Sequence, residues 1–510
     1  SGSLNAPEAF FSYKLKPAGL YQATWTNPIT NKLLLEAGFG RADGSWPTYR
    51  QPEVTRDDVS IVEQSTGMRY NSGTPTAGPL YNTQQHVPRF SQRFSASYVS
   101  GGHNFKAGFQ FEESYLELEQ ENGTHNVEYA FNNQVPVSLT QWATPYGLKA
   151  QNKDFAFYAQ DQWSLRRLTL TYGLRFEYFN GYVPPQHVDA TPNGWVPQRS
   201  FAEVKNVPLW KDLDPRFGAA YDVFGNGRTA VKVAIGRYVG KTAIGITQNN
   251  NPIQTSINSV NRTWNDSFYP VGDPRRGNYV PDCDLANRGL NGECGAMANQ
   301  NFGGLGATTR YADDALLGYG ARSYNWDFTT EVQHELRPGV SMTAGYYRNW
   351  FGNHLVTDNV LVTPADFSPF CITAPSDSRL PGGGGYEVCG LYDVSPARFG
   401  QVNSVIQQSE NFGELTRVND FFNVTLTARL KADLLVGGGV DPGRSVTDAC
   451  FEVDSPGAVA TSLPGNLAGG GAGVLNTPTP FTRTTIDGQN ICRIVTPFSG
   501  QTQLKGFFTY

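Results

Sequence analysis

Residues 168–178 read LTLTYGLRFEY, and apolar and polar side chains alternate along them without interruption. Successive side chains of a strand point to opposite faces, so this stretch is predicted to be a strand with one apolar and one polar face. A soluble strand usually spans roughly 5–6 residues. This run continues for about eleven residues, the length that crosses a bilayer at a tilt. We therefore expect a transmembrane strand.

The same alternation recurs along the chain on either side of short turns. Gly- and Asn-containing tight turns match the twist of antiparallel strands, so each turn indicates a hairpin. Six hairpins are predicted, and a last strand begins near Gln501, which gives about thirteen strands. The predicted turns lie at 27–31, 100–103, 164–167, 224–227, 337–339 and 431–433.

The connections between hairpins are long, polar and rich in Gly, Pro and Asn. They fall at about 40–90, 119–152, 180–213, 238–324, 351–401 and 439–500. Short turns on one side and long loops on the other are typical of bacterial outer-membrane barrels, whose short turns face the periplasm. Aromatic residues near strand ends fit interfacial girdles: Trp25, Tyr98, Trp163, Tyr178, Trp326 and Trp350. The alternative is a large secreted all-β protein with decorated loops.

Composition is compatible with a barrel and not with a helical membrane protein. Mean hydropathy is -0.40 and 39% of residues are hydrophobic, and no run approaches the roughly 18 apolar residues of a membrane helix. The net charge of -5 gives no electrostatic support for nucleic-acid binding. The opening residues Ser1 to Leu4 have neither a basic start nor an apolar core, so no signal peptide is predicted.

The six cysteines are all placed in the long loops. They form three sequence-local pairs: Cys283 with Cys294, Cys371 with Cys389, and Cys450 with Cys492. Six cysteines allow 15 pairings, and one pair per loop needs no crossing between loops. Disulfides persist outside the cytosol and restrain loops that lack their own core. Metal binding is the competing interpretation, but no Cys-x-x-Cys or histidine cluster supports it.

No catalytic motif emerges. The chain has no Gly-x-Ser-x-Gly elbow, no His-Glu-x-x-His and no phosphate-binding glycine loop, so we expect neither an enzyme nor a bound cofactor. Of the six histidines only His334 falls inside a predicted strand, as a lumen or interface residue. Ligand-binding residues cannot be named. Two acidic groups are candidate cation sites: Glu112, Glu113, Glu117, Glu119 and Glu121, and Asp282 and Asp284 near Asn287. We instead expect the first group to be a solvated strand end, and the spacing of the second is incomplete for a calcium loop.

The predicted hairpin from Asp154 to Trp163 (DFAFYAQDQW) and Leu168 to Glu177 (LTLTYGLRFE) resembles a mid-barrel hairpin of TonB-dependent outer-membrane receptors. Further stretches are similar to the Oar-like subgroup of that family. These are LDPRFGAAYD at 213–222, DCDL at 282–285 with NGEC at 291–294, and NWDF at 325–328. The resemblance covers essentially the whole chain, although each motif alone is a weak barrel signature.

The resemblance implies a 22-stranded barrel around a plug domain, with uptake driven by TonB and the proton-motive force. Oar-like members often carry an N-terminal β-sandwich as well. Nothing in residues 1–510 resembles the plug or that sandwich, and an odd strand count does not close an antiparallel barrel. We therefore expect a barrel region incomplete at both ends.

Two functions are expected to compete. The first is a receptor in the bacterial outer membrane that binds an unknown extracellular ligand with its loops and imports it with TonB-derived energy. Its partners would be outer-membrane lipid and, through the plug region, the TonB complex. The second is a structural or adhesive surface protein whose loops bind neighbouring molecules. A passive porin is disfavoured, because porin barrels normally have roughly 16–18 strands.

Overall fold

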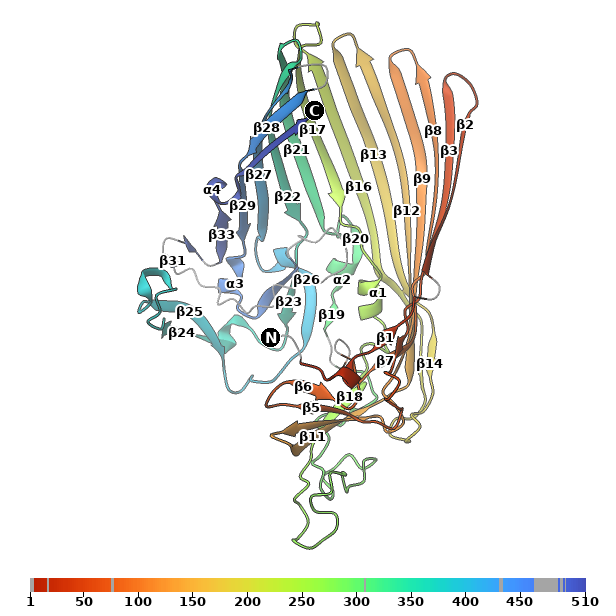
Figure 1. Ribbon diagram of the computed structural model, residues 1–510, viewed down its shortest axis with the longest axis vertical. Coiled ribbons are helices and arrows are strands. Elements are labelled where there is room, and N and C mark those ends of the chain that lie inside the picture. The colour runs from red at the N-terminus through yellow and green to blue at the C-terminus, as the bar shows by residue number, and fades with distance from the viewer. Residues whose placement is uncertain are drawn as a thin grey trace.

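A computed structural model gives the structure of the chain and describes residues 4–15, 18–74, 78–306, 309–430, 434–462, 485–486, 489–490 and 492–510. The fold is nearly all β, and one large antiparallel sheet dominates it (Figure 1). Neighbouring strands pair in chain order from the first hairpin to the last strand. We call this sheet the barrel wall. It confirms the predicted fold class, an antiparallel transmembrane barrel.

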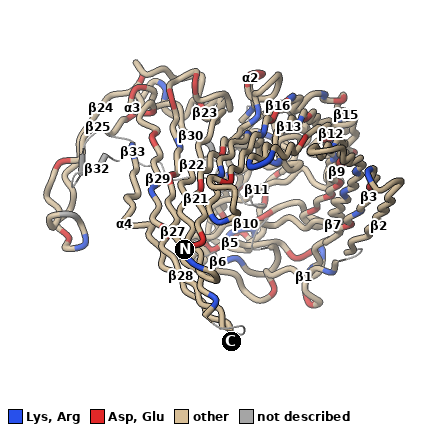
Figure 2. Tube along the Cα trace, turned by 90° about the horizontal axis from the view of Figure 1, so that it is seen from above, with Lys and Arg blue, Asp and Glu red and all other residues tan. Residues whose placement is uncertain are grey.

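The hairpins of the wall coincide with those predicted. In chain order its main strands are β2 (Ala18–Pro28), β3 (Leu33–Gly44), β8 (Arg89–Ser100), β9 (His103–Glu121), β12 (Tyr146–Leu165), β13 (Leu168–Val183), β16 (Val204–Asp222), β17 (Thr229–Val239), β21 (Tyr324–Arg337), β22 (Val340–Gly352), β27 (Thr416–Arg429), β28 (Leu435–Asp441) and β34 (Gln503–Thr509). Shorter strands extend the same sheet at its loop end: β7 (Tyr81–His86), β20 (Leu317–Tyr319), β29 (Gly443–Asp448) and β33 (Arg493–Thr496). The described residues contain no pairing between β2 and β34, so the sheet is an open arc in this structure (Figure 2).

The short turns gather at one rim of the wall. Wherever neighbouring hairpins meet, a residue beside one turn pairs with a residue beside the next: Leu33 with Tyr98, His103 with Trp163, Leu168 with Tyr221, Thr229 with His334, and Val340 with Ala428. The long connections therefore lie at the opposite rim (Figure 1). The sixth predicted turn, at 431–433, falls outside the described residues.

The two faces of the wall have opposite polarity, as the alternation predicts. Exposed aromatic and aliphatic side chains such as Phe157, Tyr172 and Leu174 occupy the convex face. Polar and charged side chains such as Gln110 and Arg175 occupy the concave, lumen face. Two of the predicted girdle residues, Trp326 and Trp350, stack with ring centroids 6.2 Å apart near the loop rim.

The strands continue further into the predicted loops than expected. At Glu112 and Glu113 the apolar side chains of β9 change from the convex face to the lumen face, so the simple alternation pattern ends there although the strand does not. On the turn side of this point the apolar residues of β9 face outward, as Phe109 does. On the loop side Leu116 and Leu118 face the lumen, where they join a buried cluster. Beyond the lipid the outside is water and the inside packs against loops, so the apolar face moves inward. Leu-Glu-Leu-Glu at 116–119 carries this signal in the sequence.

The long connections are not structureless, which corrects the expectation of irregular loops. Three of them contribute to one five-stranded loop sheet, with strand order β18-β11-β10-β5-β6. Its strands are β5 (Ser60–Glu63), β6 (Met68–Tyr70), β10 (Val127–Asn132), β11 (Val135–Trp142) and β18 (Ser259–Thr263). β5 and β10 pair in parallel, so the sheet ties the first long connection to the second.

No helix among the described residues has the length and apolar character needed to span a membrane.

Candidate functional site

The cysteines join in the three predicted pairs. The Cα–Cα distances are 5.8 Å for Cys283 and Cys294, 4.0 Å for Cys371 and Cys389, and 4.7 Å for Cys450 and Cys492. One detail differs from expectation: Cys371 and Cys389 lie on strands, β24 (Phe367–Thr373) and β25 (Glu387–Val394), which form a hairpin within the loop. The disulfide therefore crosses a β ladder rather than closing an irregular loop.

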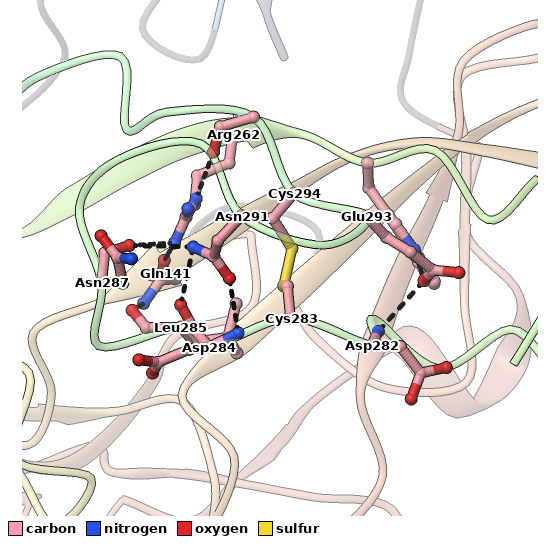
Figure 3. Close-up of a disulfide and its surroundings, with 12 residues drawn as sticks. Gln141, Arg262, Asp282, Cys283, Asp284, Leu285, Asn287, Asn291, Glu293 and Cys294 are labelled. Atoms are coloured by element: carbon pink, nitrogen blue, oxygen red, sulfur yellow. Dashed lines mark hydrogen bonds between the residues drawn. A yellow bond between two sulfur atoms is a disulfide. The ribbon is translucent and has the colours of Figure 1, made fainter. Parts of the chain in front are cut away.

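A buried arginine organises the loop that Cys283 and Cys294 close (Figure 3). Arg262 on β18 is 1% exposed and donates to the carbonyl oxygens of Asn287, Gly289 and Gly295 at 2.7–2.9 Å. Arg262 forms no ion pair among the described residues, so the dipoles of these backbone carbonyls compensate its charge. Gln141 of β11 donates to the carbonyl of Leu285 at 2.9 Å and fixes the same loop from the next strand. The loop is thus fastened to the loop sheet by hydrogen bonds as well as by the disulfide.

A second connection folds back inside the wall instead of outward. We call residues 240–258, with α1 (Gly245–Asn249), the inward loop. Thr247 and Asn251 bond Asn152 and the carbonyl of Lys149 on β12, at 2.5 and 2.9 Å. Ile253 is fully buried in the lumen-side cluster with Leu116 and Leu148. The inward loop therefore covers the lumen face of β12 near its loop end.

A pocket of about 470 Å³ lies on the lumen face below the inward loop. This lumen pocket is lined by mixed charges and amides, including Gln22, Arg93, Gln110, Glu112, Asp154, Arg175, Glu177, Lys241 and Arg322. Glycines of β3 create part of the hollow: a Cβ on Gly38 would lie 2.7 Å from Nε of Arg93. Such a polar-lined cavity is suited to a hydrophilic ligand.

Ion pairs order most of these charges. Lys241 of the inward loop contacts Glu112 at 2.5 Å, and Arg322, 2% exposed, contacts Glu177 at 3.0 Å. Arg322 also lies over Phe179 and Trp210, with 5.2 and 5.6 Å to the ring centroids. The sequence offered no signal for this pocket, because its residues come from seven strands and two loops.

Four of the five glutamates of the acidic series, all except Glu119, form ion pairs among the described residues. Glu113 contacts Lys153, Glu117 contacts Lys149, and Glu121 is held by Arg50 and Arg56. Glu121 is 6% exposed, so it is less solvated than a free strand end. No group of three potential metal ligands occurs among the described residues, and Asp282 and Asp284 gather no calcium loop there.

Only His334 was predicted within a strand, but His86, His103 and His187 also lie in strands: β7 (Tyr81–His86), β9 and β14 (Gln186–Val188). His103, predicted within a turn, begins β9, and its Nδ1 lies 2.7 Å from Asp161 on the convex face. His354, in the connection after β22, is 3% exposed. Its burial lowers the pKa to about 4, and the nearby charge of Arg417 acts in the same direction. His334 lies near the turn rim with Nδ1 2.8 Å from the Thr229 hydroxyl, which is an interface position.

The barrel wall is matched over most of its length by a family model for an outer membrane beta barrel domain, which covers residues 2–411. The chain belongs to this family. Its place is the bacterial outer membrane. No curated protein matches the sequence.

Solved structures to which the chain is similar include the outer membrane transporter YddB from Escherichia coli, with 13% identity, a TM-score of 0.46, and coverage of 86% of this chain and 44% of that chain. The alcaligin outer membrane receptor FauA from Bordetella pertussis shows 10% identity and a TM-score of 0.37, with 86% and 49% covered. The ferric-catecholate import receptor Fiu from E. coli shows 9% and 0.37, with 84% and 47% covered. The chain spans about half the length of these proteins.

Proposed function

We propose that this chain forms the wall of an outer-membrane receptor that captures a ligand with its outer loops and imports it through the lumen. Membership of the outer-membrane barrel family supports a position between the exterior and the periplasm. The observation that carries the assignment is the inward loop, which is anchored to β12 and roofs a polar pocket on the lumen face. A protein that only displayed loops would have no use for a pocket on this inner face.

Energy would come from the TonB complex, acting through a plug region of the kind the family resemblance implies. The short motifs at 213–222, 282–285 and 325–328 support assignment to the Oar-like subgroup. The mechanism assigned to the chain includes no enzymatic step and no cofactor. Ligand recognition, plug movement and release to the periplasm would suffice for import.

A structural or adhesive role is the second candidate. The loop closed by Cys283 and Cys294, with its neighbouring segment, exposes large apolar side chains such as Val271 (90%) and Leu290 (77%). Exposed apolar groups of this kind suit contact with another macromolecule. In this role the loops would bind a neighbour without import.

Uptake measurements separate the two candidates. Cells with the intact gene and cells from which it is deleted are compared for accumulation of labelled nutrients, with and without a protonophore. Import predicts at least one solute whose accumulation is lost both on deletion and on collapse of the proton-motive force. Unchanged uptake in the deletion strain, with loss of attachment between cells or to a surface, would support the adhesive role instead.

A further inference from the structure

The lumen pocket contains two charges of opposite sign that lack an ion-pair partner among the described residues. Asp154 on β12 enters no ion pair, and its Oδ1 is buried without a hydrogen bond. Arg93 on β8 is exposed on the same face and enters neither an ion pair nor a hydrogen bond in the described part of the chain. The neighbouring Glu36 is already held by Lys106 at 2.8 Å and by Ser95 at 3.2 Å.

Each of the other charged side chains of the pocket contacts a side chain of opposite charge. Lys241 is bound to Glu112, and Arg175 and Arg322 share Glu177. Arg93 and Asp154 are therefore the charged side chains of the pocket that contact no opposite charge among the described residues, while the sharing of Glu177 leaves one further positive charge on Arg175 and Arg322. Burying Arg93 or Asp154 alone is unfavourable, because an unpaired charge loses solvation without gaining a partner.

Strand register fixes the separation of the two charges. β9 lies between β8 and β12: Gln110 pairs with both Arg93 and Ala156, and Glu112 pairs with both Ser91 and Asp154. Arg93 and Asp154 are thus two strand spacings apart and two residues apart along the strands. With about 4.8 Å per strand and about 3.3 Å per residue, the Cα atoms are about 12 Å apart. The Arg93 side chain leans over Gly38 of β3, on the side of β8 away from β12, so its guanidinium comes no closer to Asp154 than the Cα separation implies.

We propose that the lumen pocket binds a short zwitterionic peptide of about three residues, with its α-ammonium at Asp154 and its α-carboxylate at Arg93. An extended tripeptide places its terminal charges on the order of 10 Å apart. A free amino acid is too short to reach both groups. Gln22, Gln110 and the other amides of the pocket supply hydrogen-bonding partners for the peptide backbone. The inference names the ligand class for the proposed import function and rests on it.

Capped peptides test the two contacts separately. Binding of trialanine, N-acetyl-trialanine and trialanine amide to the detergent-solubilised protein is measured by saturation-transfer NMR titration. Each cap should weaken binding about three- to tenfold, the range of a partly exposed ion pair. In Asp154→Asn the acetyl cap should lose its effect while the amide cap keeps it. In Arg93→Gln the opposite pattern is expected.

Asp189→Asn is the matched control, because it makes the same charge change at a side chain that is 96% exposed and outside the pocket. Its cap effects should equal those of the unaltered protein. Equal affinity of all three peptides for the unaltered protein would overturn the inference even if neither variant folds. Cap effects that persist unchanged in both variants would do the same.

These binding measurements need no transport. Trialanine binding in a protein whose deletion leaves all uptake unchanged would reject the import function and keep the pocket assignment. Energised uptake of another solute without any preference for free peptide ends would reject the pocket assignment alone.

Discussion

Leu170 and Thr171 are adjacent residues of β13 that face different solvents. Leu170 lies on the convex, lipid-facing side with Tyr172 and Leu174, and Thr171 lies on the lumen side with Arg175. An arginine at the bilayer midplane costs a transmembrane barrel roughly 2–4 kcal/mol, whereas a lumen position is solvated. Leu170→Arg should therefore lower the folded fraction in lipid vesicles far more than Thr171→Arg. The gel mobility of unheated samples measures that fraction. Equal losses of folded protein in the two variants would contradict the assignment of Leu170 to the lipid face and Thr171 to the lumen face.

Burial of His354 should make the local stability of its surroundings depend on pH. Its folded pKa of about 4 lies below the usual 6.5, so the unfolded chain binds the proton more readily. Above pH 6.5 His354 is neutral in both the folded and the unfolded state, so its burial costs no stability. As the pH drops from 6.5 to 4, the free energy of local unfolding falls by on the order of 1 kcal/mol per pH unit. Hydrogen exchange of the peptide at 404–415, which includes Ser409 bonded to the His354 carbonyl, should accelerate over this range. His354→Gln should remove most of that pH dependence. A slope that is unchanged in the variant would assign the effect to another group.

At the scale of elements, the three disulfides are expected to be local. Each should contribute roughly 2–4 kcal/mol to the order of its loop by restricting the unfolded chain. Mass spectrometry of non-reduced peptides should find Cys283 with Cys294, Cys371 with Cys389, and Cys450 with Cys492. A cross-link such as Cys294 to Cys371, or six free thiols, would reject this pairing.

Reduction should then loosen the loops and leave the wall intact. Arg262 and Gln141 still hold the loop at 283–294 by hydrogen bonds, so this loop should resist limited proteolysis after reduction better than the hairpin of β24 and β25. Reduced Arg262→Gln protein should lose that advantage. Retained resistance in this variant would show that the arginine does not fasten the loop.

The wall was predictable because lipid imposes a simple rule on its strands. A residue such as Leu170 must be apolar and its neighbour Thr171 need not be, so alternation marks both the strand and its faces. The loop sheet follows no such rule. β5 and β10 are short, pair in parallel and come from different connections, so their contact depends on the tertiary fold.

The lumen pocket, like the loop sheet, could not be predicted from the sequence. Arg93, Asp154 and Arg322 stand far apart in the chain, and only the register of β8, β9 and β12 and the inward course of the later loops bring them to one face. The change of the apolar face at Glu112 and Glu113 can be recognised in the sequence once the structure is known. It marks where the outer solvent changes from lipid to water.

For the whole molecule, all described short turns should face the periplasm and the cysteine loops the exterior. Single cysteines at Gly101 and Asn226, on the turn rim, are compared with one at Val271, whose side chain is 90% exposed in the long connection between β18 and β21. A membrane-impermeant maleimide should label Val271→Cys in intact cells and label the turn variants only after the outer membrane is opened. Labelling of any turn variant in intact cells would place turns on both sides.

The directions of the two edge strands limit how the open sheet can close into a barrel. β2 and β34 both run from the loop layer toward the turn rim, since β2 precedes its turn and Gln503 of β34 pairs with Asp441 at the loop end of β28. Two strands of the same polarity pair only in parallel if they meet directly. If the sheet closes with antiparallel pairs only, an odd number of strands must lie between β2 and β34, whichever chain supplies them. The backbone N–H and C=O groups at both edges can pair with such strands.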